Sequence, residues 1–111
     1  FRIMIIENNK SVLKLKLSNF NNVKLFFKNQ LVKYPNKDVI LVVDFDLDMK
    51  LINYLNKWKT LLGASGNILV VVSEIFISAQ SPNNELFIIP TIEEANDFIE
   101  LENIKRDLEN L

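Results

Sequence analysis

Three aspartates at alternate positions, Asp44, Asp46 and Asp48, are the residues of this sequence with the clearest capacity for chemistry. They lie at and just after the end of DVILVVDF (38–45), a β-branched apolar run that predicts a buried strand. Open α/β sheets bind ligands at the carboxyl ends of their strands, where carboxylates can hold Mg²⁺ or accept a phosphoryl group. One hypothesis is therefore a magnesium-dependent phosphoryl-transfer enzyme or a receiver-like domain. Mg²⁺-dependent chemical-shift changes confined to these aspartates would favour it.

A structural interpretation of the same aspartates is the one we favour. VVDFD resembles the nucleophile motif of haloacid-dehalogenase-like phosphatases, but those enzymes need further lysine and aspartate motifs on a longer chain. Aspartates that follow strands commonly form turns and cap helices, and Asp48 is well placed to cap the next helix. We therefore predict no catalytic residue, no metal site and no cofactor, which means that the protein is not an enzyme.

The composition excludes several other kinds of site. The sequence contains no cysteine and no histidine, so disulfide scaffolds, thiolate nucleophiles, cysteine or histidine zinc sites and serine–histidine–acid triads are impossible. Gly63-Ala-Ser65-Gly66 looks like a phosphate-binding loop, but it follows a predicted helix rather than a strand. It therefore predicts a helix C-cap.

Length and composition predict one globular domain over residues 1–111. The chain has 111 residues, of which 49% are hydrophobic and 24% charged. It has no apolar stretch near the ~20 residues needed to span a bilayer, so we predict no membrane partner. The opening FRIMIIENNK lacks the small-residue cleavage site of a secretory signal and predicts a strand in a cytoplasmic protein.

The charges are unevenly distributed along the chain. Residues 1–60 contain eleven Lys/Arg and five Asp/Glu, whereas residues 61–111 contain two and nine. The two halves could neutralise each other within the fold, or the acidic half could face a basic partner. Because the lysines are scattered among core-spaced residues, we predict no nucleic-acid partner.

Hydrophobic periodicity predicts an α/β fold with a small mixed sheet of about five strands flanked by helices. The first two strands should form a hairpin with one solvated face, and the helix after them should bury Phe20, Val23 and Phe27. The predicted elements are strands over 2–7 and 11–17, a helix over 19–33, a strand over 38–45, a helix over 47–62 that ends at Gly63 or Gly66, a strand over 67–73, a loop over 74–85, a strand over 86–89 and a final helix.

The final helix raises a question of its own. Thr91 and Glu94 form a T-x-x-E capping box at its start, and one apolar stripe should pack on the sheet. That stripe consists of Ile92, Ala95 and Ile99. A second stripe extends past the predicted sheet, and residues 100–111 are predicted to be an extension of the helix. Its members are Phe98, Leu101, Leu108 and Leu111. The extension is either a tail that folds along its own domain or a docking helix for a partner or a second copy.

Several motifs resemble those of STAS domains, the fold of bacterial anti-sigma-factor antagonists. They are DVILVVDFDLD, a helix that ends in GASGNILVVVS, and LFIIPTIEEANDFIE. The resemblance covers residues 38–102 and is sharpest at 86–99. Short STAS-like proteins that end in an acidic tail are more similar still, with Glu102, Arg106, Asp107 and Leu108 at the matching positions. The resemblance implies a STAS-like fold and a regulatory protein–protein interaction function, with an unknown protein partner or a homodimer.

This sequence differs from the family at its regulatory site. STAS phosphorylation switches carry Asp-Ser-Ser-Gly at the start of the second helix, but no Ser or Thr lies between Asp44 and Thr60. We therefore predict a domain without the phosphoacceptor, in which Asp48 either imitates a phosphoserine or only caps the helix. Some short relatives have been labelled ribonuclease Z. Such nucleases bind two zinc ions through histidines, which this sequence lacks, so we predict no such activity.

Overall fold

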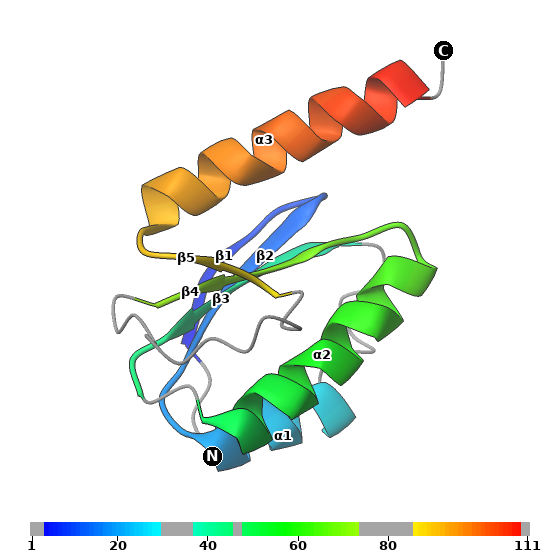
Figure 1. The fold of residues 1–111 in the computed structure, drawn as a ribbon. Helices are drawn as coiled ribbons and strands as arrows, with labels where there is room; N and C mark the ends of the chain where they lie inside the picture. The colour runs from blue at the N-terminus through cyan, green and yellow to red at the C-terminus, as the bar shows by residue number, and fades with distance from the viewer. Residues whose placement is uncertain (1–3, 30–36, 46–47, 74–85, 110–111) are drawn as a thin grey trace.

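The computed structural model describes residues 4–29, 37–45, 48–73 and 86–109 (Figure 1). Within these ranges it shows an α/β fold with a five-stranded mixed sheet and three helices, which confirms the predicted class. The elements are β1 (Met4–Asn8), β2 (Val12–Leu17), α1 (Phe20–Asn29), β3 (Asp38–Val43), α2 (Met49–Ala64), β4 (Leu69–Val72), β5 (Phe87–Ile89) and α3 (Ile92–Glu109). The predicted 74–85 loop lies outside the described residues.

The strands follow one another across the sheet in the order β1-β2-β3-β4-β5. Only β1 and β2 pair in an antiparallel manner, as the predicted hairpin, and the remaining neighbours are parallel. In β2 the leucines Leu13, Leu15 and Leu17 are buried on one face, while Lys14 and Lys16 alternate with them. The parallel pairing brings the carboxyl ends of β2, β3 and β4 to the same edge of the sheet.

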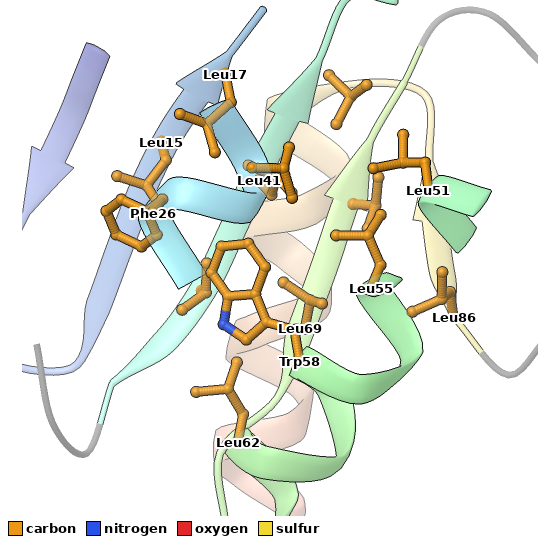
Figure 2. Close-up of a cluster of buried hydrophobic side chains, with 14 of the residues drawn as sticks. Leu15, Leu17, Phe26, Leu41, Leu51, Leu55, Trp58, Leu62, Leu69 and Leu86 are labelled. Atoms are coloured by element: carbon orange, nitrogen blue, oxygen red, sulfur yellow. The ribbon is translucent and has the colours of Figure 1, made fainter. Parts of the chain in front are cut away.

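Helices cover both faces of the sheet. Figure 1 shows α3 on one side of it and α1 with α2 on the other. The larger buried cluster lies beneath α1 and α2, and Figure 2 shows the Trp58 ring of α2 beside Phe26 and leucines of the sheet. The smaller cluster joins α3, through Ala95 and Ile99, to β-strand residues such as Ile40. In α1 the predicted burial of Val23 is confirmed, but Phe20 and Phe27 are only half-buried, and it is Phe26 that is fully buried.

Hydrogen bonds cap the start of α1 and the end of α2. The Asn19 side chain accepts the Asn22 N–H at 2.9 Å at the start of α1. At the end of α2, Gly66 has a φ of +78°, and the Asn67 N–H reaches the Leu62 carbonyl at 3.0 Å. This is a left-handed cap of the Schellman type, so of the two glycines proposed to end α2 it is Gly66 that does so. Gly63 lies within the last turn of the helix.

Candidate functional site

The carboxyl edge of the parallel strands contains a pocket of about 570 Å³. It is lined by Lys16, Val42, Val43, Asp44, Val72, Pro90, Thr91, Ile92 and Glu93, so it lies between the ends of β2, β3 and β4 and the start of α3. Its position is the one at which open α/β sheets usually bind ligands. Most of its lining is aliphatic, and its charged side chains are one lysine and two carboxylates.

Of the aspartates proposed for chemistry, Asp44 and Asp48 lie within the described residues, and their side chains contact different groups. Asp44 follows β3 and forms an ion pair with Lys16, whose Nζ lies 3.5 Å from the Asp44 Oδ2. Both side chains are exposed enough for water to screen the pair. Asp46 lies outside the described residues. Among the residues that the structure does describe, no group of three or more acidic side chains is placed to hold a metal ion.

Asp48 is the N-cap of α2, as predicted. Its backbone is extended, with φ −81° and ψ 172°, and its Oδ1 accepts the Leu51 N–H at 2.8 Å. A side-chain oxygen in this position pairs one of the backbone donors that a helix start leaves free. Capping therefore accounts for an aspartate at this position of the sequence.

Replacing Asp48 by alanine should lower the free energy of unfolding by about 1 kcal/mol, because the Leu51 N–H loses its acceptor. Asp48→Ser should retain most of this stability, since serine caps helices about as well. Chemical denaturation of the two variants measures the difference. As a control, Asp44→Ala removes only the exposed pair with Lys16 and should change the stability by less than about 0.5 kcal/mol. Equal losses for Asp48→Ala and Asp48→Ser would contradict the capping role.

The second candidate site is α3, which packs against the rest of the domain along most of its length. At its start, the Thr91 Oγ1 accepts the Glu94 N–H at 3.1 Å, which confirms the threonine half of the capping box. One and two turns later, Ala95 and Ile99 are buried against the sheet, as predicted. Further along, Phe98 packs on Phe87 of β5, with ring centroids 4.7 Å apart. Of the side chains proposed for docking, Phe98 therefore takes part in the packing of its own domain.

Arg106 fixes the C-terminal part of α3 to the opposite edge of the sheet. Its Nη2 donates to the Asp38 Oδ2 at 2.7 Å, and its Nη1 donates to the Asp38 Oδ1 at 3.2 Å and to the Gly66 carbonyl at 3.0 Å. Asp38 opens β3, is 2% exposed, and also accepts the Ile68 N–H at 3.0 Å. The hydrogen bond to Asp38 raises the pKa of the Arg106 guanidinium, although partial burial acts in the opposite direction.

This contact bears on the two alternatives for the helix extension beyond residue 100. Arg106 anchors the described part of that segment to residues at the starts of β3 and β4, so this part lies along its own domain. The pair was missed in the sequence because Asp38 and Arg106 are 68 positions apart and each has a local explanation, as a strand residue and as a basic residue near a helix end.

An apolar stripe remains on the outer side of the anchored helix. Leu101, Ile104 and Leu108 are 59%, 56% and 63% exposed. Their spacing of three and four residues places them on one face of α3, opposite the buried Ile99. Ile104 was not among the residues predicted for docking, although this spacing identifies it. Leu111 lies outside the described residues.

Comparisons with known proteins do not assign the chain to a family. No family model, no curated protein and no solved structure matches it. The resemblance to STAS domains therefore rests on the sequence motifs. Of the helices within the described ranges, none is long and apolar enough to cross a membrane.

Proposed function

We propose that this protein is a divergent STAS-like domain that acts by binding another protein, without catalysis and without a phosphorylation switch. The observation that carries this proposal is the stripe of Leu101, Ile104 and Leu108 on a helix whose opposite face packs on the sheet and is anchored by Arg106. Single exposed apolar residues are ordinary on protein surfaces, but a contiguous row on one helix face is typical of a docking surface.

The anchoring of α3 matters for this function. A helix that is already formed and fixed loses little conformational entropy when a partner binds, so more of the contact energy appears as affinity. Burial of Ala95 and Ile99 against the sheet holds the helix before the stripe, and the Arg106 contact with Asp38 holds it within the stripe. A partner that lays an apolar helix or groove against the stripe would use the helix-in-groove type of recognition.

The STAS-like assignment is supported by the order of elements and by the sequence motifs. Two strands, a helix, a strand, a helix, two strands and a helix follow one another, and the last two elements flank the Pro-Thr motif of the resemblance. Asp48 stands near the position of the missing phosphoacceptor and is engaged as a helix cap. We therefore propose a constitutive interaction domain of a bacterial cytoplasmic protein, not a switch.

Replacing Leu101 and Leu108 together by lysine should abolish capture of the partner while leaving the fold intact. Both side chains are exposed, and lysine is nearly as good a helix former as leucine, so the stability should change by less than about 0.5 kcal/mol. The measurement is affinity capture from lysate of the source organism, with quantitative mass spectrometry of the proteins retained by each variant.

The matched control is Ile5→Lys/Ile6→Lys, which adds the same charge at two exposed apolar residues of β1. This control should retain the captured protein. Equal capture by all three proteins would mean that α3 is not the docking surface. No specific capture by the wild type would contradict the interaction function itself.

A further inference from the structure

The two helical layers of the molecule carry opposite charge. α1 and α2 contain no acidic residue, and their basic residues are Lys24, Lys28, Lys50, Lys57 and Lys59. α3 contains seven acidic residues and only two basic ones. The sheet separates the two layers (Figure 1). Among the described residues, the helical layer on one side of it is therefore basic and the layer on the other side acidic.

The charges on both sides are available to a partner. Within the described part of the chain, Lys24, Lys28 and Lys57 form no ion pair, and neither do Glu100 and Asp107 on α3. Arg106, one of the two basic residues of α3, is directed inward onto Asp38, which leaves the outer surface of the helix more acidic still.

Apolar side chains are exposed on both layers as well. The stripe of α3 is Leu101, Ile104 and Leu108, and the opposite layer exposes Leu25 of α1 with Met49 and Leu61 of α2. On α2, Lys57 and Leu61 are four residues apart and thus on the same side of the helix. Each side of the molecule therefore combines exposed apolar side chains with charge of one sign, and the charges of the two sides are complementary.

We propose that the partner of α3 is a second copy of this chain, which receives the acidic helix on its basic α1–α2 layer. This inference rests on the proposed function, because it takes α3 as the docking surface. It adds the identity of the partner that binds there. Contact between two α3 helices is disfavoured, because each brings an excess of carboxylates to the contact. Nucleic acid would use the lysines of α1 and α2 but would leave the stripe of α3 without an occupant.

Such a contact is heterologous, because it joins two different sides of the molecule. Every dimer retains one free acidic side and one free basic side, so further copies can associate head to tail. A single helix seated on two others buries less area than the roughly 800 Å² per partner of a standard interface. Association should therefore be weak, dependent on concentration and sensitive to salt.

Complementation between two variants tests the geometry. Leu101→Lys/Leu108→Lys removes the α3 surface but keeps the basic layer, whereas Lys28→Glu/Lys57→Glu removes the basic layer but keeps α3. Each variant alone should sediment as a monomer in analytical ultracentrifugation, with folding checked by circular dichroism. Their mixture should form a one-to-one pair that does not grow further. Its dissociation constant should be similar to that of the wild-type contact and should rise at least about tenfold between about 0.05 M and 0.5 M salt.

Three results would overturn the inference. The first is a wild type that stays monomeric at all concentrations and salt levels. The second is a wild-type dimer that Lys28→Glu/Lys57→Glu does not weaken, since that dimer would be symmetric. The third is a variant mixture that stays monomeric although the wild type associates. If α3 still captures a different protein in any of these cases, the occupant is wrong while the proposed interaction function stands.

Discussion

Replacing Arg106 by alanine should lower the free energy of unfolding by about 3 kcal/mol. The change leaves the carboxylate of Asp38 buried with the Ile68 N–H as its only remaining donor among the described residues, and it removes the Arg106 hydrogen bond to the Gly66 carbonyl. Breaking a buried pair from one side costs more than the pair itself contributes, because an uncompensated charge remains in the interior. Urea denaturation measures the loss.

The neighbouring lysine is a matched control for this change. Lys105 also pairs with an acidic residue, but its contact with Glu102 is long, at 3.5 Å, and the lysine side chain is exposed. Lys105→Ala should therefore change the stability by less than about 0.5 kcal/mol. In Arg106→Ala, amide hydrogen exchange should also accelerate most in the last turns of α3, which lose their anchor. A loss no larger than that of Lys105→Ala would mean that the pair does not anchor the helix.

Replacing Trp58 by alanine should be more damaging still, with a loss of about 4 kcal/mol. Trp58 is fully buried and lies beside the Phe26 ring, with the centroids 5.6 Å apart (Figure 2). The centroid of the Phe27 ring is 5.9 Å from that of Trp58. The substitution removes this contact area and leaves a cavity between α1, α2 and the sheet, and both effects destabilise the protein. Thermal or urea unfolding followed by circular dichroism measures it.

A phenylalanine at the same position separates the contribution of the aromatic ring from that of the indole N–H. The Trp58 Nε1 has no acceptor among the described residues, so Trp58→Phe removes an unpaired donor and keeps an aromatic ring in place. We expect a loss of about 1 kcal/mol for Trp58→Phe, and less than about 0.5 kcal/mol for Leu61→Ala at an exposed position of the same helix. If Trp58→Ala and Leu61→Ala cost the same, Trp58 is not central to the core.

Much of the fold could be predicted because its signals are local. The apolar run of β3, the alternation of β2 and the cap at Asp48 each depend on residues within a few positions of one another. The errors arise where burial depends on how an element is oriented on the sheet, because hydrophobic periodicity does not specify that orientation. In α1, a rotation of the helix about its axis buries Phe26 more deeply than Phe27, although both are compatible with one amphipathic helix.

The candidate site was less predictable, because its main determinant is a long-range contact. The apolar stripe of α3 could be seen in the sequence, but whether the helix is free or anchored depends on Arg106 meeting Asp38 across the sheet. Asp38 lies at the start of an apolar strand, where an aspartate is usually exposed in a turn. No neighbouring residue in the sequence indicates that Asp38 is buried and pairs with a guanidinium.

Capture of a partner by the stripe of α3 is the measurement that tests the account most directly. Wild-type protein and Ile5→Lys/Ile6→Lys should retain the same specific protein, a second copy included, and Leu101→Lys/Leu108→Lys should lose it without losing stability. If the stripe variant retains that protein as well as the wild type does, α3 is only a structural helix of its own domain, and the proposed docking surface is wrong.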